Sequence, residues 1–344
     1  MELDQRKLQI LRAIIDEYIL SASPVGSKSI SRNPELGWSS ATIRNEMADL
    51  EMLGYLASPH TSAGRIPSDK AYRLYVDQML RRANLTERET RVLDQYYQSR
   101  ISGVESVLWS TAEALSDITN YTAVVLMPEL SVNRLKHVQL VPITEGKALL
   151  VIVTDAGVAS DTIIDVPQEM TSEELEQISR IITARCYNCR MATVAERILK
   201  ELDREMQSRA SVLGQMLEAI RERIDDGTAR IALSGAKNML HYPEYSDVNK
   251  AKAFLSTVEQ RDAMYRMLKR ASVMEFTVTI GQENEAEGLK DCSIVTASYR
   301  INEEPFGTFG IIGPTRMDYN HVVSVMEGAL LNMGQILQSI LKED

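Results

Sequence analysis

The sequence predicts an α+β protein with more than one domain. The chain has 344 residues, and at about 100–200 residues per domain this length suggests two or three domains. Segments with the pattern of strands lie between residues 121 and 166 and again between 275 and 314, with mostly helical residues from 171 to about 270. Strands on both sides of a helical stretch indicate one α+β domain that is interrupted by an insertion. A mostly helical unit precedes this domain.

The N-terminal unit begins with two predicted helices. Apolar side chains recur at spacings of three and four residues from Leu8 to Ile19, and this period predicts an amphipathic helix over residues 4–20. Ser23 can cap a second, shorter helix, and Pro24 suits its first turn. We expect this second helix to end near Arg32.

A third helix is predicted after the turn at residues 33–38, which contains Asn-Pro and Gly. Either Ser39 or Ser40 is a good N-cap, and Gly54 is a typical residue just beyond a helix end. The apolar stripe of this helix consists of Ile43, Met47 and Leu50.

Two short extended segments, YLAS and RIPS, follow on either side of the exposed loop SPHTSAG, and another helix starts at about Pro67. The order helix, helix, turn, helix and two-stranded loop is that of a winged helix-turn-helix. In such a domain the third helix enters the major groove, and its first turn carries short polar side chains because the backbone approaches the DNA there. The hairpin beyond carries basic and small polar residues that reach phosphates or the minor groove.

The rest of the chain alternates between helical and extended patterns. Residues 84–120 are helical and rather polar. Predicted strands are YTAVVLMPEL, LKHVQLVPI, KALLVIVTDAG and SDTIIDVP before the helical stretch, and FTVTIG, CSIVTASYRI and GTFGIIGP after it. The helical stretch opens with TSEE, a capping sequence, and a last helix is predicted over residues 321–341.

Composition restricts the class of protein. The net charge is −10, yet residues 1–82 carry 11 lysines and arginines against 10 acidic residues, so the N-terminal unit is basic relative to the acidic remainder. That asymmetry is compatible with one domain that faces nucleic acid. Three cysteines, no signal peptide and no long apolar run favour a cytoplasmic protein. Common enzyme motifs are absent, and four histidines offer little for acid–base chemistry, so we expect no enzyme.

Three strings resemble the HrcA family of bacterial heat-inducible transcription repressors. They are SSATIRNEMADLEMLGYL at residues 39–56, TSAGRIPSDKAYRLYVD at residues 61–77, and GTFGIIGPTRMDY at residues 307–319. The likeness extends over the whole chain, although LSGAKNML at residues 233–240 departs from the family pattern. It implies a homodimer that represses class I heat-shock genes by binding an inverted-repeat operator called CIRCE in double-stranded DNA. It also implies that a GroEL-type chaperonin maintains the repressor and that heat stress inactivates it.

The resemblance also implies a domain organisation. The winged helix-turn-helix would occupy residues 1–80, and a discontinuous GAF-like domain would occupy residues 81–170 and 272–344. A mostly helical dimerisation domain at residues 171–271 would be inserted into the GAF-like domain. The long amphipathic helices within residues 191–224 are a natural dimer surface, but they could instead pack only within the insertion. An alternative function is a winged-helix repressor whose GAF-like domain senses a small molecule.

The candidate DNA-contacting residues lie on the third helix and the hairpin. Asn can bond adenine bidentately, and Arg can bond guanine or a phosphate. The predicted contacts on the third helix are Ser39, Ser40, Thr42, Arg44 and Asn45. The predicted contacts of the hairpin are Thr61, Ser62 and Arg65, with Lys28 and Lys70 as nearby neutralisers of the backbone. The alternative is that the helix face is merely solvated and that Pro59 and Gly64 merely close a hairpin, which leaves Arg65 unexplained.

Two further motifs favour structural roles. Cys186 and Cys189 form a C-x-x-C, but no second pair completes a zinc site, and on a helix the two cysteines would share one packed face. We therefore predict no metal and no cofactor. In the string at residues 312–319, a Gly-Pro turn could bind an anion, but a strand-to-helix junction is favoured, with Asp318 as the helix cap and Arg316 paired with an acid.

Overall fold

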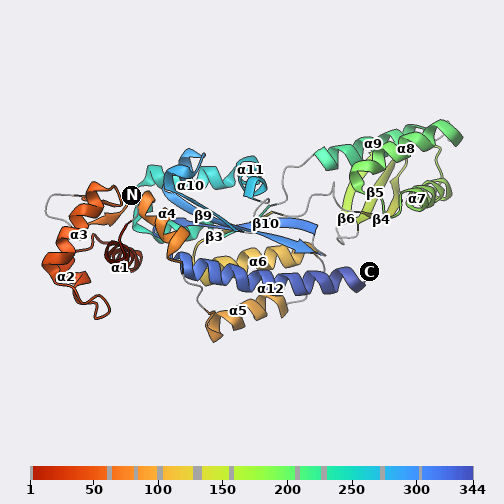
Figure 1. Ribbon diagram of the computed structural model, residues 1–344. Coiled ribbons are helices and arrows are strands. Elements are labelled where there is room, and N and C mark those ends of the chain that lie inside the picture. The colour runs from red at the N-terminus through yellow and green to blue at the C-terminus, as the bar shows by residue number, and fades with distance from the viewer. Residues whose placement is uncertain are drawn as a thin grey trace.

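The structure is a computed structural model of the 344-residue chain, and Figure 1 shows its arrangement. Three parts follow one another across the view: a small helical unit, a central five-stranded sheet covered by helices, and a separate lobe at the far end. The chain is thus of the predicted mixed α+β class. The residues that the structure describes are 3–59, 64–80, 84–98, 104–126, 134–154, 159–205, 210–225, 231–271, 276–301 and 304–343.

The N-terminal unit contains the predicted elements in the predicted order. Its helices are α1 (Gln5–Ser21), α2 (Ser27–Ile30), α3 (Ser40–Met52) and α4 (Asp69–Gln78), and its short antiparallel strands are β1 (Leu56–Ala57) and β2 (Ile66–Pro67). Capping explains where α1, α3 and α4 begin, whereas α2 follows Gly26 without a side-chain cap, so the predicted cap at Ser23 was wrong. The side chains of Asp4, Ser39 and Ser68 accept hydrogen bonds from backbone N–H groups three residues ahead.

The central sheet is antiparallel throughout, with the strand order β7-β3-β10-β9-β8. The strands are β3 (Thr122–Leu126), β7 (Ile231–Ser234), β8 (Phe276–Ile280), β9 (Cys292–Ile301) and β10 (Glu304–Pro314). Helices cover both faces (Figure 1). On one side lie α5 (Glu87–Gln98), α6 (Val104–Thr119) and α12 (Tyr319–Glu343); on the other lie α10 (Val248–Glu259) and α11 (Arg261–Ala271).

Alternation along the strands explains this three-layer packing. Ala123 and Val125 of β3 join the core under α6 and α12, whereas Val124 and Leu126 join the core under α10 and α11. Successive side chains of a strand point to opposite faces, so a strand that is buried throughout supplies both cores. This is why the apolar run beginning at Tyr121 has no polar face.

The distal lobe has its own sheet and its own core. Its strands are β4 (Leu135–Thr144), β5 (Lys147–Thr154) and β6 (Ala159–Asp165), paired antiparallel in that order. Its helices are α7 (Ser172–Cys186), α8 (Met191–Glu205) and α9 (Ala210–Asp225), and their apolar faces share one hydrophobic cluster with the sheet.

The observed sheets differ from the domain boundaries expected from sequence. Residues 81–170 were expected to belong with residues 272–344, yet β4, β5 and β6 do not pair with the central sheet. Conversely, α10 and α11 lie within residues 171–271, expected to form the insertion, but they pack on the central sheet. Alternating hydrophobicity predicts that a segment is a strand, but it does not identify the strand's partner. From the separate hydrophobic core of the distal lobe we propose that the insertion runs from about residue 134 to about residue 225.

Several short elements connect these parts. Two short 3₁₀ helices, η3 (Ala236–His241) and η4 (Pro243–Tyr245), follow β7. Two more, η5 (Gly281–Glu283) and η6 (Glu287–Leu289), lie between β8 and β9. Within the described part of the chain, α-helices lack the combination of length and hydrophobicity needed to cross a lipid bilayer.

Candidate nucleic-acid interface

Helix α3 has one anchored face and one exposed face. Ile43, Met47 and Leu50 are buried in the core of the N-terminal unit. Arg44 and Asn45 are exposed on the other side, and neither side chain makes a hydrogen bond or an ion pair with any other described residue. The helix therefore presents two long polar side chains that are free to bind an external partner.

The serines and the threonine at the start of α3 are engaged within the unit. The Ser39 Oγ accepts a hydrogen bond from the Thr42 backbone N–H at 3.1 Å and lies 2.9 Å from the Thr42 hydroxyl. The Ser40 hydroxyl lies 3.0 Å from that of Ser27 on α2. These contacts set the position of the first turn of α3, and the exposed Ser39 remains accessible at its tip.

Glu46 anchors α3 electrostatically to α1. It is a buried acid, and it accepts from Lys7 Nζ at 2.7 Å and from Arg6 at 3.3 Å. Asp49 lies 3.1 Å from the same Lys7 ammonium. Hydrogen bonds to Glu46 and Asp49 raise the pKa of Lys7 above its ordinary value. Sequence reasoning missed this anchor, although an acid between two buried residues of one helix was a signal for it.

The hairpin residue Arg65 faces α3. Its Nε donates to Glu51 Oε2 at 2.9 Å, and its Nη2 lies 2.8 Å from the same oxygen. Its backbone exchanges two hydrogen bonds with Val25, at 2.8 and 2.9 Å. Arg65 thus braces the hairpin against α3 and against the segment before α2.

The other predicted basic residues have different surroundings. Lys70 donates to the Leu53 carbonyl at 2.9 Å and lies over the Tyr55 ring, so it caps the C-terminal end of α3. Lys28 on α2 is exposed, and no other described residue pairs with its ammonium. Thr61 and Ser62, predicted at the hairpin tip, lie outside the described residues.

Polar bonds join the N-terminal unit to the central sheet. The Tyr75 hydroxyl of α4 donates to Asp16 at 2.7 Å and accepts from Asn320 of α12 at 2.7 Å. Burial and the bond to Asp16 raise the pKa of Tyr75. Arg316 donates to the Ile19 carbonyl at 3.0 Å near the end of α1.

Arg316 is also paired with an acid, as predicted. Its Nε lies 2.5 Å from Glu244 Oε1, and its guanidinium is stacked over Tyr242. Asp318 accepts from the His321 backbone N–H at 3.0 Å at the start of α12. The Gly-Pro string is therefore a strand-to-helix junction that also holds the end of α1.

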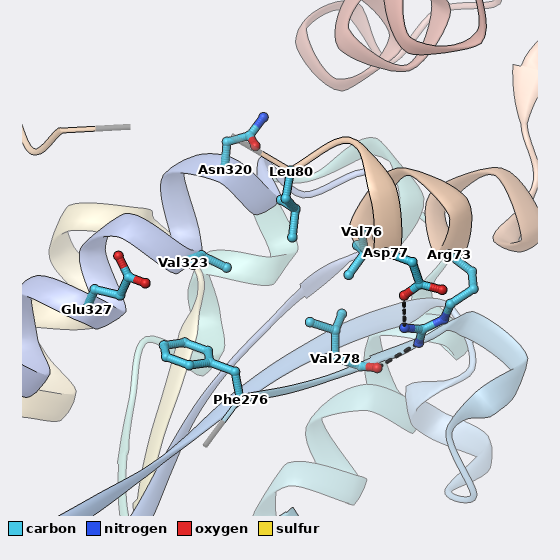
Figure 2. Close-up of a pocket in the computed structure, with 9 residues that line it drawn as sticks. All are labelled: Arg73, Val76, Asp77, Leu80, Phe276, Val278, Asn320, Val323 and Glu327. Carbon is cyan, nitrogen blue, oxygen red and sulfur yellow. Dashed lines mark hydrogen bonds and ion pairs between the residues drawn. The ribbon is translucent and has the colours of Figure 1, made fainter. Parts of the chain in front are cut away.

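Arg73 of α4 forms a further part of this seam. It donates to the Val278 carbonyl of β8 at 2.7 Å and to Glu283 at 2.9 Å, and Asp77 lies beside it (Figure 2). A cavity of about 380 Å³ remains between α4, β8 and α12, lined by apolar side chains that include Phe276 and Val323. The two parts are thus joined here by directed polar bonds beside this cavity, and nearby by apolar contacts of Tyr72 and Tyr75 with Tyr319.

The cysteine pair does not share a helix face. Helix α7 ends at Cys186, which is buried in the core of the distal lobe, and Cys189 follows in the turn after it. The turn includes Asn188 with φ 60°, a conformation that interrupts a helix. The expectation that both cysteines lie on one helix was therefore wrong for Cys189, although Cys189 does pack against the same hydrophobic cluster as Cys186.

Comparison with known proteins identifies the family. A model described as the HrcA protein C terminal domain matches residues 105–323. The heat-inducible transcription repressor HrcA of Brevibacillus brevis is 40% identical over 337 residues, which cover 98% of each chain. The protein of the same name from Ruminiclostridium cellulolyticum is 42% identical over 346 residues, which cover 99% of each chain.

A solved structure shares the fold. A crystal structure described as that of a hypothetical protein at 2.2 Å resolution aligns with 98% of this chain and 100% of its own, with a TM-score of 0.67 and 24% identity. The family match and the near-full-length identity to named repressors show that the chain belongs to the HrcA family of heat-inducible transcription repressors, which are negative regulators of heat-shock transcription.

Proposed function

We propose that the protein is a homodimeric repressor that binds an inverted-repeat, CIRCE-type operator in double-stranded DNA. In this proposal the N-terminal unit is a winged helix-turn-helix, and α3 lies in the major groove. The observation that carries it is the exposed, unpaired pair Arg44 and Asn45 opposite the anchored face of α3. The family is a class of transcription repressors and not of enzymes, and a protein that acts on bacterial operators works in the cytoplasm.

The chemistry of α3 supports this assignment. Arg recognises guanine O6 and N7 or a phosphate, and Asn recognises adenine N6 and N7. Lys7 and Arg6 hold Glu46, so the recognition face is fixed to α1 before DNA arrives. A helix that is already positioned loses less conformational entropy on binding.

The basic residues around α3 divide into two roles in this proposal. Lys28 is exposed and unpaired among the described residues, so we assign it to a phosphate. Arg65 and Lys70 are bonded to Glu51 and to Leu53. In this proposal Arg65 contacts a phosphate while its guanidinium remains bonded to Glu51. Lys70 contributes by capping the C-terminal end of α3. Thr61 and Ser62 remain proposed contacts of the hairpin tip.

We place the dimer contact on the outer face of the distal sheet. Val141, Leu149 and Ile163 are direct neighbours across β4, β5 and β6 and form an apolar row on the face away from the lobe's helices. Val141 is 41% exposed and Ile163 is 59% exposed. Apolar side chains grouped on one exposed sheet face can mark a contact between proteins, and a two-fold copy of the same face can cover them.

The helical surface that the sequence suggested is less suitable. Met191, Val194 and Ile198 of α8, and Val212, Met216 and Ile220 of α9, are buried in the lobe's own core. The apolar side chains described on these helices therefore pack within the insertion. This favours the sheet face over the helices as the contact between copies.

The dependence on a GroEL-type chaperonin and on temperature belongs to the same proposal. A chaperonin binds exposed apolar surface, and a dimer held by an apolar sheet face would expose such surface when heat separates its subunits. The supporting observation is again the row of Val141, Leu149 and Ile163.

A mobility-shift titration with an inverted-repeat operator tests the proposal directly. The purified protein is titrated with and without chaperonin at a growth temperature and at a heat-shock temperature, with a scrambled duplex of equal length as control. We expect tight, salt-sensitive binding to the operator, loss of binding after heating, and recovery with chaperonin. Equal affinity for operator and scrambled DNA would overturn the assignment of sequence-specific binding. Binding that is insensitive to heat and chaperonin would remove only the regulatory part.

One observation favours the second candidate function, a repressor whose central domain, GAF-like in this proposal, also senses a small molecule. A cavity of about 710 Å³ lies between α11 and the edge of the central sheet. Ligand pockets in proteins have volumes of about 300–1,000 Å³.

A further inference from the structure

The cavity beside α11 has an apolar wall and a polar floor. The apolar surface comes from Met264, Met267, Leu289 and Ile294. Of these, Met264, Leu289 and Ile294 are buried. The floor comes from β8 and β9, where two pairs of direct neighbours face the cavity: Thr277 with Thr296 and Thr279 with Ile294. Such a cavity suits a ligand with an apolar body.

One polar group of the floor lacks a partner. The Thr277 hydroxyl is buried and has no hydrogen-bond partner among the described residues. Thr279, in contrast, donates to Asn284, which in turn donates to two backbone carbonyls. A buried hydroxyl without a partner is costly, and a rotation of the Thr277 side chain that turns the hydroxyl into the cavity would let an acceptor on a bound molecule remove that cost.

One charge on the rim is left without an ion-pair partner among the described residues. Four ionisable side chains line the cavity: Arg266, Arg270, Glu283 and Glu285. Arg270 pairs with Glu285, and Glu283 pairs with Arg73 of α4. Arg266 makes no ion pair or hydrogen bond with any other described residue, so it is the rim charge that is available to an anionic group in the cavity.

The cavity is connected to the N-terminal unit through η5. Glu283 both lines the cavity and binds Arg73. The neighbouring Gln282 N–H donates to Asp69 of α4 at 3.1 Å. Gly281, with φ 53°, lies so close to this carboxylate that a Cβ there would overlap it. A ligand that shifts η5 therefore acts on both side chains by which α4 contacts this turn.

Strand β8 transmits the same change to its other face. Thr277 and Thr279 face the cavity, whereas Phe276 and Val278 face α4 and α12 (Figure 2). The Val278 carbonyl is the third group that binds Arg73. The cavity and the contact between α4 and the central sheet thus share one edge strand, β8.

We infer that this cavity binds an amphipathic monocarboxylate, with its apolar body against Met267 and Ile294 and its carboxylate at Arg266, and that occupancy changes operator affinity through Glu283 and Arg73. The binding part stands on the cavity alone. The regulatory part rests on the proposed operator binding.

Octanoate is the probe, with octanamide and octylammonium as neutral and cationic molecules of similar length. On the full-length protein, we expect octanoate to raise the melting temperature and to bind measurably by calorimetry, and octylammonium to do neither. Arg266→Gln should weaken octanoate binding about tenfold while leaving octanamide binding unchanged, since only a charge-assisted bond is lost. Arg261→Gln, an exposed arginine on the same helix that does not line the cavity, is the matched control.

Thr277→Val tests the unpaired hydroxyl. The valine variant should be at least as stable as the wild type without ligand, because no hydrogen bond is lost, and should bind octanoate and octanamide more weakly. Unchanged octanoate affinity in both Arg266→Gln and Thr277→Val, or octylammonium binding as tight as octanoate binding, overturns the ligand assignment.

Coupling is measured by operator titration with and without octanoate. We expect the operator Kd to change about fivefold or more, and the operator to change the octanoate Kd by the same factor, because linkage is reciprocal. Arg73→Gln should keep octanoate binding and lose most of this factor. Operator affinity that octanoate leaves unchanged overturns the regulatory part. A protein that binds octanoate but no operator instead refutes the proposed DNA-binding function.

Discussion

Arg73 and Glu283 form an ion pair across 210 positions of the chain, with the Arg73 Nε 2.9 Å from Glu283 Oε1. One residue belongs to the last helix of the N-terminal unit and the other to a turn of the central sheet. With Tyr75–Asn320 and Arg316–Ile19, this pair supplies directed polar contacts between the N-terminal unit and the central part. These bonds act beside apolar packing, because the cores of the two parts form one hydrophobic cluster in which Tyr72 and Tyr75 lie against Tyr319.

The stability provided by this ion pair should depend on pH. Burial alone would raise the pKa of the Glu283 carboxyl, but the Arg73 hydrogen bonds, the Ile280 N–H and the Arg73 charge together lower it below its ordinary value of 4.5. A carboxyl with a lowered pKa in the folded state stabilises that state above the ordinary pKa. The contribution is lost as the pH falls through the lowered value.

Urea unfolding at pH 6 and at pH 3 measures this effect. Because both side chains are partly exposed, we expect Glu283→Gln to cost no more than about 1 kcal/mol at pH 6. The difference from the wild type should shrink at pH 3. A difference that is the same at both pH values would show that the carboxylate charge contributes nothing.

Arg44→Ala and Asn45→Ala should each weaken operator binding by about 1–3 kcal/mol if the side chain reads a base, and Arg44→Ala by less if it holds a phosphate. Both side chains are exposed and unpaired among the described residues, so the melting temperature should not change. Fluorescence anisotropy with operator variants measures the affinity and shows whether specificity relaxes at one position. Arg91→Ala, on the surface of α5, is the control. Wild-type affinity in both variants would remove α3 from the interface.

Gly64→Ala should damage the hairpin. A Cβ at Gly64 would overlap the Val25 carbonyl and lie 2.7 Å from the Pro24 carbonyl carbon, next to the backbone bonds between Val25 and Arg65. Overpacking of this kind costs about 1–3 kcal/mol. We expect a lower melting temperature and weaker operator binding.

Gly26→Ala is the comparison for that variant, because Gly26 has no atom within 4 Å of an added Cβ and an extended backbone. It should leave both the melting temperature and the operator affinity close to the wild type. Equal effects of the two substitutions would argue against the close contact at Gly64.

Ile163→Glu should convert the dimer to a monomer. The substitution places a charge at the β6 end of the apolar row on the distal sheet, and an unpaired charge at a buried interface is strongly unfavourable. Because Ile163 is 59% exposed in a single chain, the monomer should fold normally. Sedimentation velocity measures the mass, and operator binding should weaken because two half-sites are no longer read together.

Leu331→Glu, on the exposed face of α12, provides the control for the dimer. It should leave the mass and the operator affinity unchanged. A dimeric Ile163→Glu protein would place the contact between copies elsewhere.

Much of the N-terminal unit could be predicted from the sequence. Ser39 caps α3 and Ile43, Met47 and Leu50 are its buried stripe, because caps and helical periodicity depend on residues only a few positions apart. The exposure of Arg44 and Asn45 follows from the same periodicity. The part of the candidate site that lies on α3 was thus predictable, because its geometry depends on residues within one helix.

Contacts between distant residues were not predictable in this way. Arg65 and Lys70 are basic residues near α3, but their bonds to Glu51 and to the Leu53 carbonyl depend on how the hairpin folds back. The sequence likewise contains no sign that Arg73 meets Glu283. An ion pair needs two side chains within a few ångströms, and only the tertiary fold brings them together.

The sequence by itself determined most of the elements and their order, the starts of α3 and α4 and the face that α3 exposes, but it missed strand β7 and placed the cap of α2 wrongly at Ser23. The tertiary structure alone decided that β4, β5 and β6 form a separate sheet, that α10 and α11 cover the central one, and that a cavity lies beside α11. Helix caps and hydrophobic periods arise from neighbours in the chain. Strand pairing and cavities arise from the packing of segments that are far apart in sequence.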